Sequence, residues 1–331
     1  MGLRIVNIKG ISLADYYNNS LVKVTSMTGK VVLSAKKALN FVSGYFGSKS
    51  RWPLGEGYQY ASKPVERELF KRNFHYLLMA NATVSRKPEQ RVQPFGFEYC
   101  DHLALLENLN IKGDFQADSK VIYSDKGNLT LSIFENEGEI VIGFGNKSPN
   151  RSRGILTSNQ RYSILNWLGV TPTVYRESEK IVRAILDSNY FKGKKVKLVG
   201  VCYRASLASY VASRLGLSAV CGDSAPLGAG LQRIIGRKRL QESYDNIIHI
   251  STQHDFVGEN RWLTFFSKFF DLIGLRTPGN FGKRYHIPPA YPKDNYRSHM
   301  FFYSSIMKHL GYSERTSPTA LKEEDLLYHL K

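Results

Sequence analysis

The sequence predicts an α/β fold built around a mostly parallel, doubly wound sheet. From about residue 98 onward, short apolar segments typical of strands alternate with longer segments of helical periodicity. The expected strands are 119–124, 129–134, 139–145, 195–201, 218–225 and 246–252, and the expected helices are 173–191, 203–216 and 296–312. Strands that alternate with helices are typical of a sheet covered by helices on both faces.

Each element has its own local signal. The first three strands are separated by the turn sequences DKGN and ENEG. The helix that follows them is amphipathic, because Val174, Ile181 and Ile185 recur at helical spacing. The run KVKLVGV, which ends at Val201, is short and apolar enough for a buried strand, and Gly216 is a typical residue at the end of the next helix.

Composition divides the chain into three regions. The α/β domain is expected at 98–315. Residues 1–97 form a basic appendage of unknown role, with 15 Lys and Arg against five Asp and Glu. This appendage is expected to be helical, with helices at 31–46 and 64–82 and a proline-containing linker at its end. A tail helix is expected at 316–331.

The sequence shows no apolar run long enough to span a bilayer and no signal-peptide pattern near its start. We therefore expect a cytoplasmic protein. Peripheral membrane contact, or delivery into a host cell without a cleaved signal, is compatible with this pattern.

The three cysteines, Cys100, Cys202 and Cys221, lack the spacing of a disulfide framework or a zinc site. No metal and no other cofactor is expected.

The formal net charge is +18 at pH 7. Such an excess attracts polyanions, which include nucleic acids and anionic lipid surfaces. The chain has no helix-turn-helix, zinc-finger or RNP-type motif, so nucleic acid is not the expected partner. A preference for an anionic membrane or substrate is one interpretation, and a basic surface that only keeps the protein soluble is the other.

The candidate site lies in KVKLVGVCYRASLASYVASRLG, residues 195–216. A strand followed by a sharp turn and a helix is the element that presents a nucleophile, and its neighbours must be small so that strand and helix approach closely. Gly200 precedes Cys202 by two residues, and the helix that follows is rich in Ala and Ser. Arg204 stands where a glycine is usual, and its side chain is expected to point outward.

This region resembles the class 3 (fungal-type) lipases of the α/β-hydrolase family. The sequence GVCYRASLA lies over the family pattern G-H-S-L-G-G-A-L-A, with Cys202 in place of the nucleophilic serine. The run IVIGFGNK resembles the strand that ends in the family's F-R-G-T turn, with Gly145 and Asn146 replacing Arg and Gly. The resemblance covers roughly residues 120–312 and implies an oxyanion hole formed by the backbone N–H of Tyr203 and one N–H from Gly145–Asn146.

The resemblance also implies a triad in the chain order nucleophile, acid, histidine. Asp255 follows an apolar strand and resembles the family's acid, and His299 resembles the late catalytic histidine. In this interpretation His299 takes the proton of Cys202, and Asp255 orients the imidazole. His286 is the competing histidine, and it resembles a structural histidine of the family.

Other nucleophiles in the chain have weaker settings. Cys221 is expected inside a strand and Cys100 in a helix-like stretch, so both are interpreted as structural. The strand, sharp turn and helix around Cys202 are called the elbow below. Ser206 lies one turn into the helix of this elbow, and Ser224 lies in a turn that no helix follows. Neither serine has the surroundings that activate a hydroxyl.

The residues leave three chemistries open at Cys202. A thiol is a stronger nucleophile than a hydroxyl near neutral pH and forms a thioester. The site could thus be a lipase-like hydrolase, or an acyltransferase or thioesterase similar to polyhydroxyalkanoate synthases, whose box reads G-x-C-x-G. It could also be a scaffold that has lost catalysis and binds an anionic membrane or a protein partner. A deamidase or protease using the same triad is a further alternative.

Two segments bear on the substrate. The run 261–275 is rich in Phe and Leu, which fits a core helix or a lid over an acyl-chain groove. The basic run 233–239 could hold lipid phosphates. A lipid or phospholipid acyl ester is therefore the expected substrate class.

Overall fold

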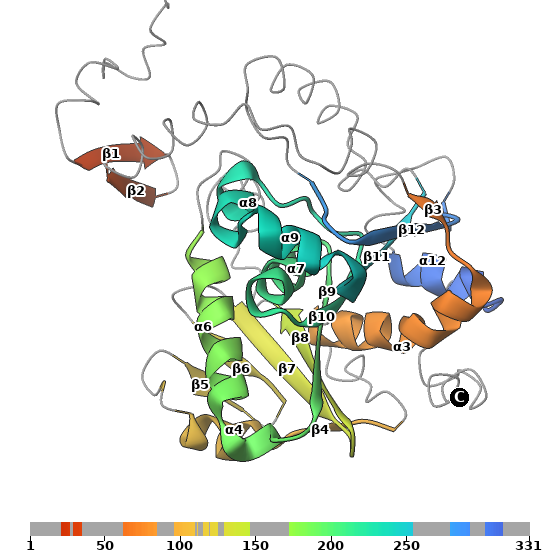
Figure 1. The fold of residues 1–331 in the computed structure, drawn as a ribbon, viewed down its shortest axis with the longest axis horizontal. Coiled ribbons are helices and arrows are strands. Elements are labelled where there is room, and N and C mark those ends of the chain that lie inside the picture. The colour runs from red at the N-terminus through yellow and green to blue at the C-terminus, as the bar shows by residue number, and fades with distance from the viewer. Residues whose placement is uncertain are drawn as a thin grey trace, which may run out of the picture.

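The computed structural model describes residues 21–26, 29–34, 62–84, 96–109, 111, 115–118, 120–124, 129–145, 172–253, 279–291 and 302–313. At the centre of this part lies a ten-stranded mixed sheet (Figure 1). Its strands are β3 (Lys63–Pro64), β4 (Glu98–Tyr99), β5 (Gln116–Ala117), β6 (Ile122–Ser124), β7 (Leu129–Glu135), β8 (Glu139–Gly145), β9 (Lys195–Val201), β10 (Ser218–Gly222), β11 (Ile247–Thr252) and β12 (Lys283–Ile287).

The strand order across the sheet is β3-β12-β11-β10-β9-β8-β7-β6-β5, and β4 pairs with β7. The pairs from β3 to β8 are parallel, whereas β8-β7, β7-β6, β6-β5 and β4-β7 are antiparallel. The sheet is thus mostly parallel, with an antiparallel meander at one side. Parallel strands carry their carboxyl ends to the same edge of a sheet, and this edge holds the turn after β9.

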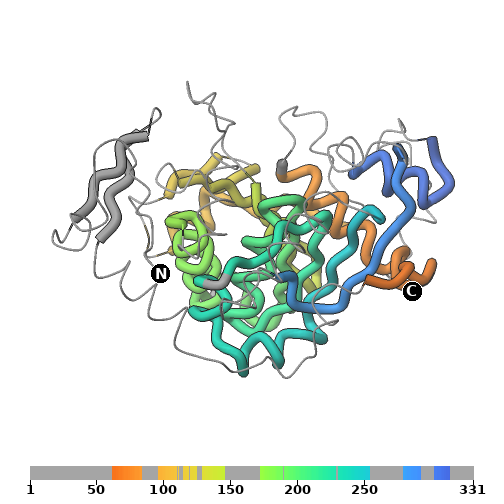
Figure 2. The backbone as a smooth tube through the Cα atoms, turned by 90° about the horizontal axis from the view of Figure 1, so that it is seen from above, coloured from red at the N-terminus to blue at the C-terminus, as the bar shows by residue number. Residues whose placement is uncertain are grey.

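Helices cover both faces of this sheet. They are α3 (Arg67–Val84), α4 (His102–Asn108), α6 (Thr173–Asp187), α7 (Tyr203–Leu215), α8 (Ala229–Ile235), α9 (Arg237–Glu242) and α12 (Phe302–His309), with short 3-10 helices at Asn189–Phe191 and Tyr244–Asn246. The helices α6 to α9 belong to one hydrophobic cluster, and α3 and α12 belong to another. Figure 2 shows residues 62–84 in orange on the opposite side of the strands from α8 and α9.

Alternation along the buried strands builds the two clusters. Successive side chains of a strand point to opposite faces, so Leu198 packs toward α7 while Val199 packs toward α3. Ala219 and Val220 divide between the faces in the same way. Because both faces are covered, the central residues of these strands are apolar on both faces, as in parallel strands generally. The predicted α/β class is confirmed.

The predicted elements around the candidate site agree closely with the observed ones. The strand expected at 195–201 is β9, and the helix expected at 203–216 is α7. The strand expected at 218–225 ends earlier, at Gly222, because Asp223 takes a φ of 41° that leaves the extended conformation.

The helix expected at 31–46 is contradicted over its first residues. β2 (Gly29–Ser34) is a strand that pairs antiparallel with β1 (Leu21–Ser26). The valines of both segments favour extended structure, and pairing between the two strands overrides the helical spacing. Residues 35–46, the linker through residue 95 and the tail helix expected at 316–331 lie outside the described residues.

Part of the N-terminal region is integral to the sheet. The helix expected at 64–82 is α3, whose Phe74 and Leu77 are fully buried in the same cluster as Val199 and Val220. β3 adds a short parallel strand beside β12. Residues 62–84 thus lie before the predicted domain boundary at residue 97 and still contribute to the core of the α/β domain.

Candidate functional site

Cys202 occupies a strained turn between β9 and α7. Its backbone has φ 59° and ψ −130°, a conformation that residues other than glycine rarely adopt. Such strain costs about 1–3 kcal/mol and persists only where the surrounding structure imposes it. The sharp strand–turn–helix predicted from the sequence is therefore present, with the thiol of Cys202 at its tip and partly exposed.

Gly200 makes this sharp turn possible. A Cβ at this position would lie 2.5 Å from the backbone C and O atoms of Arg204 and 2.7 Å from the backbone N of Ala205. The first turn of α7 therefore lies directly against β9. A residue with any side chain would have to push the helix away from the strand.

Backbone hydrogen bonds fix Cys202 at the carboxyl edge of the sheet. Its N–H donates to the carbonyl of Gly222 at 2.8 Å. Its carbonyl accepts from the N–H groups of Ala205 at 3.1 Å and Ala225 at 3.3 Å. The turn is thus held both by its own helix and by the chain that leaves β10.

Two of the three residues predicted to form the oxyanion hole, Tyr203 and Gly145, lie in the part of the chain that the structure describes. Tyr203 is the first residue of α7, the helix end at which backbone N–H groups and the dipole favour negative charge. Gly145 ends β8, and the register that pairs Gly143 with Val199 brings it level with Val201. Asn146 lies outside the described residues.

A glycine is required at position 145 because the end of α3 lies against it. A Cβ at Gly145 would lie 2.6 Å from the backbone O of Thr83 and 2.6 Å from Oγ1 of Thr130. The end of α3 thus occupies the space that a side chain at position 145 would need. No larger residue fits at this position without displacing α3.

The predicted acid and histidine, Asp255 and His299, both lie outside the described residues. The strand that precedes Asp255, β11, ends at Thr252 on the same edge of the sheet as Cys202. The competing His286 lies in β12, where its Nδ1 is 3.1 Å from Oγ of Ser62. Since β12 is three strands from β9, this backbone position is about 14 Å from the nucleophile strand.

The other cysteines and serines are held in structural contacts. Cys221 is fully buried and its Sγ donates to the carbonyl of Ala205 at 3.4 Å. Burial raises the pKa of the thiols of both Cys221 and Cys100. The buried hydroxyl of Ser206 donates to the carbonyl of Tyr203 at 2.6 Å, and that of Ser224 to the next carbonyl at 3.2 Å. These contacts agree with the interpretation of all four as structural.

Arg204 does not point outward as expected. Its residue is half-buried, and its Nε is fully buried and makes no hydrogen bond. Burial lowers the pKa of the Arg204 guanidinium, and the electrostatic influence of Cys202 and Tyr203 acts in the opposite direction. The side chain of Arg204 is therefore not fully extended into solvent.

Asp223 is a residue of this edge that sequence reasoning missed. It directly follows β10, is fully buried and takes a φ of 41°. Its Oδ1 accepts from the backbone N–H of Thr252 at 2.8 Å, which ties the ends of β10 and β11 together. A signal was present in GDSAPLG, where Asp next to Gly favours a turn, but the partner strand could not be read from it.

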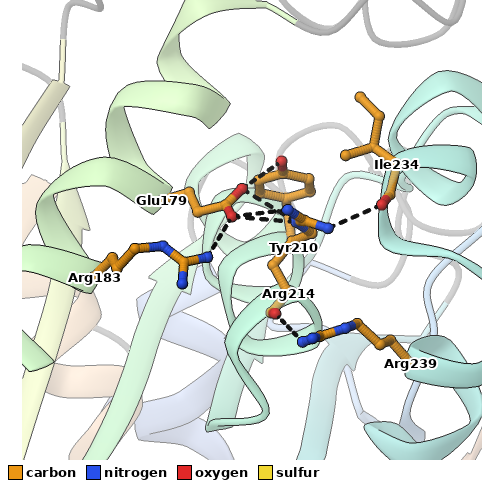
Figure 3. Close-up of polar contacts among 6 residues, drawn as sticks. All are labelled: Glu179, Arg183, Tyr210, Arg214, Ile234 and Arg239. Atoms are coloured by element: carbon orange, nitrogen blue, oxygen red, sulfur yellow. Dashed lines mark hydrogen bonds and ion pairs between the residues drawn. The ribbon is translucent and has the colours of Figure 1, made fainter.

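A polar cluster holds α7 to the helices around it (Figure 3). Glu179 of α6 accepts from Nη2 of Arg214 at 3.0 Å, from its Nε at 3.2 Å and from the hydroxyl of Tyr210 at 2.9 Å. Arg214 also donates to the carbonyl of Ile234 in α8, and Arg239 of α9 donates to the carbonyl of Arg214. The helix that carries the elbow is thus fixed to three neighbouring helices.

Within the described residues, no group of three or more His, Cys, Asp or Glu side chains is arranged to hold a metal ion. Within the same residues, no helix has the length and apolar character that crossing a membrane requires.

Comparison with known proteins adds little to this description. No family model matches the chain, and no curated protein matches it. Among solved structures, the chain is similar to the Rhizomucor miehei lipase propeptide complex in its native form, with 13% identity and a TM-score of 0.33 over 66% of this chain and 74% of that chain. A likeness of this size assigns no family, so the chain is described by its own sheet and helices as an α/β protein.

Proposed function

We propose that the chain is an α/β-hydrolase-type enzyme that cleaves or transfers an acyl ester through a thioester on Cys202. Asp255 and His299 complete the proposed triad, and Tyr203, Gly145 and Asn146 the proposed oxyanion hole. The observation that carries the proposal is the backbone of Cys202, a strained non-glycine residue at a strand–helix turn closed over Gly200. Strain of this kind clusters at active sites, where it aims a reacting group.

The proposed reaction has two steps. In the first, Sγ of Cys202 attacks the ester carbonyl carbon, the carbon–oxygen bond to the alcohol breaks, and the alcohol leaves with the proton that the thiol gave up. In the second, water or another acceptor attacks the thioester carbonyl, the carbon–sulfur bond breaks, and the thiol is restored. Donors at the N-terminus of α7 would stabilise the negative oxygen that develops in both steps.

The surface of α8 and α9 supports a lipid as the substrate class. Arg233, Arg237 and Lys238 are exposed there, and Ile234 among them is 41% exposed. Exposed cations that surround an apolar side chain suit the interface of an anionic membrane. α8 also begins shortly after the carboxyl end of β10, on the edge of the sheet that carries Cys202.

The test is incubation of the full chain with p-nitrophenyl esters of short and long fatty acids. We expect a burst of about one equivalent of nitrophenol and an acyl adduct that peptide mass spectrometry places on Cys202. The Cys202→Ala variant should lose both signals, while the matched Cys221→Ala variant should keep them. Absence of an adduct at every chain length, with the folded protein, would overturn the proposal.

A non-catalytic scaffold is the second candidate, and the half-buried Arg204 favours it, because a large residue stands where the turn that presents a nucleophile usually has a glycine. Such a scaffold would bind vesicles containing phosphatidylserine but form no acyl adduct. Co-sedimentation with anionic vesicles, and its loss in an Arg237→Glu, Lys238→Glu variant, would identify this alternative.

A further inference from the structure

Asn280 is a buried polar residue near the Cys202 turn that has no part in the predicted triad. It is 5% exposed, and its Nδ2 donates to the carbonyl of Ser224 at 3.0 Å. Its Oδ1 is also buried and accepts no hydrogen bond from the described residues. Burial of an amide side chain is unfavourable unless its hydrogen bonds are made. The bond to Ser224 is therefore the described contact that accounts for an amide at this position.

The residues on either side of Asn280 are themselves fixed by hydrogen bonds. Gly279 and Leu227 exchange two backbone bonds, with N–O distances of 2.9 and 3.0 Å. The carbonyl of Phe281 lies 3.1 Å from Nε2 of His249, a buried side chain of β11. Since both neighbours are tied down, the backbone of Asn280 is held against the chain that leaves β10.

The amide of Asn280 begins a series of hydrogen bonds that passes through two peptide groups. A peptide group contains the carbonyl of one residue and the N–H of the next. The carbonyl of Ser224, which accepts from Asn280, shares its peptide with the N–H of Ala225. This N–H donates to the carbonyl of Cys202 at 3.3 Å. The carbonyl of Cys202 in turn shares its peptide with the N–H of Tyr203, a predicted oxyanion donor. The series from Asn280 to this N–H is called the relay below.

We propose that Asn280 is a positioning residue, which orients and polarises the peptide group between Cys202 and Tyr203 through the relay. Hydrogen bonds in series polarise one another, so a peptide whose carbonyl accepts a bond is a better N–H donor. Stabilisation of an oxyanion depends on donors that are oriented before the reaction begins. No proton moves along the relay. The inference deepens the proposed function, because it rests on Tyr203 as an oxyanion donor of that site.

The other hydrogen bonds of the turn hold it in a different way. The N–H of Ala205 also donates to the carbonyl of Cys202, at 3.1 Å, but it belongs to the first turn of α7 and moves with that helix. The bond from the N–H of Cys202 to Gly222 fixes the preceding peptide group. Among the described residues, the bond from Ala225 is the backbone bond that reaches the Cys202 carbonyl from outside α7. The relay therefore fixes this peptide relative to the sheet.

The first test observes the peptide directly and needs no substrate. The chain has three cysteines, and the residues that follow them are Asp101, Tyr203 and Gly222. Labelling of cysteine carbonyls with ¹³C and of tyrosine nitrogens with ¹⁵N therefore marks the Cys202–Tyr203 peptide alone, and an HNCO spectrum of the full chain shows one resonance. We expect its carbon and nitrogen frequencies to fall in the Asn280→Leu variant, which keeps a side chain of similar size and removes the donor.

The Gln232→Leu variant is the matched control. Gln232 is another buried amide, and its Nε2 donates at 2.7 Å to the carbonyl of Leu227 in the same chain after β10. That carbonyl belongs to a peptide outside the relay. This variant should lose stability as Asn280→Leu does and leave the resonance in place. An unmoved resonance in Asn280→Leu, or an equal movement in both variants, would overturn the inference.

The second test is the rate of Cys202 acylation by a p-nitrophenyl ester. The Asn280→Leu variant should lower this rate at saturating ester by about tenfold, a part of the 100- to 1,000-fold that loss of an oxyanion donor costs. KM should change little, because the donor acts on the transition state more than on the bound ester. The Asn280→Gln variant retains an amide donor and should recover part of the rate, and Gln232→Leu should keep the full rate.

The two tests separate this inference from the proposed function. A resonance that moves as expected in a protein that forms no acyl adduct would contradict the proposed function and still support the relay. Acylation at an equal rate in wild type and Asn280→Leu would overturn the inference and leave the proposed function intact. If Asn280→Leu does not fold, Asn280→Ala removes the same donor without adding volume and takes its place in both tests.

Discussion

At the scale of single residues, the site depends on a glycine and a strained cysteine that lie two positions apart. Gly200 allows the backbone of α7 to touch β9, and this contact forces the positive φ of Cys202. The sharp turn requires both the glycine at position 200 and the positive φ of Cys202. The turn places Cys202 at the carboxyl edge of the sheet, where it is partly exposed. Cys221, on the neighbouring strand β10, is buried in the core.

Replacement of Gly200 by alanine should destabilise the fold by about 2 kcal/mol, because the new Cβ meets backbone atoms that no side-chain rotation can relieve. Urea denaturation measures the change. The matched Gly138→Ala variant should be nearly neutral, since nothing lies within 4 Å of a Cβ there. Equal stability of the two variants would show that α7 does not press on β9.

The sequence indicated the elbow but not the side chains around it. Gly200, Cys202 and the small residues of the helix form a local pattern, so adjacent positions suffice to recognise it. The direction of Arg204 and the bond from Thr252 to Asp223 depend on how α7 and β11 pack, which local patterns do not contain. Asp255, Asn146 and His299 lie outside the described residues, so the triad stays a prediction.

At the scale of elements, the position of α7 depends on its contacts with α6, α8 and α9. Glu179 is central to these contacts, because it accepts from both Arg214 and Tyr210. Burial alone would raise the pKa of its carboxyl, but the hydrogen bonds from Arg214, Tyr210 and Arg183 outweigh burial and hold the pKa below its ordinary value. The helix that presents Cys202 is therefore secured at its far end by an ionised carboxylate.

This depressed pKa predicts a loss of stability in acid. The contribution of Glu179 should be complete above about pH 4.3, the ordinary glutamate value, and should disappear as the pH falls through the lower folded value. The Glu179→Gln variant should lose about 2 kcal/mol at pH 7 and depend less on pH below that point. Chemical denaturation from pH 3 to 7 measures both effects.

The exposed pair Lys238–Glu242 provides the control for this prediction, with 3.8 Å between charged atoms. The Glu242→Gln variant should change stability by less than about 0.5 kcal/mol, because exposed pairs at helical spacing contribute little. A comparable loss in both variants would mean that the Glu179 cluster is no stronger than a surface ion pair.

Elements were predicted with uneven success, and the reason differs from case to case. β9, α7 and β11 have unambiguous apolar patterns and were located within a residue or two. β2 was expected to be helical, because Val32 also fits a helical period and only pairing with β1 decides between the two. Periodicity identified α3 as a helix, yet it gave no information on which surface the helix covers.

At the scale of the whole molecule, α3 makes residues 62–84 part of the α/β body. Its apolar face packs on the sheet face opposite to α7, beside Val141, Val199 and Val220. The end of the same helix fills the space beside Gly145. Helix α3 therefore both covers the face of the sheet opposite to α7 and limits the space at the predicted oxyanion turn.

The Phe74→Ala variant tests this arrangement. Phe74 is fully buried, so its truncation should cost about 3–5 kcal/mol and lower the stability of the whole domain in one cooperative transition. The Arg72→Ala variant on the exposed side of α3 should stay within about 0.5 kcal/mol of the wild type. A separate early transition in calorimetry, with the main one unshifted, would mean that α3 unfolds independently.

The two margins of the sheet have a consequence for self-association. The path of paired strands ends on both sides in a strand of only two residues, β3 at one margin and β5 at the other. Long unpaired strands at a margin invite pairing with another chain, and short ones offer few backbone groups for it. Seven described strands between them are enclosed by neighbours of the same chain. The margins of the ten-stranded sheet therefore offer few backbone groups for edge-to-edge pairing with another copy of the chain.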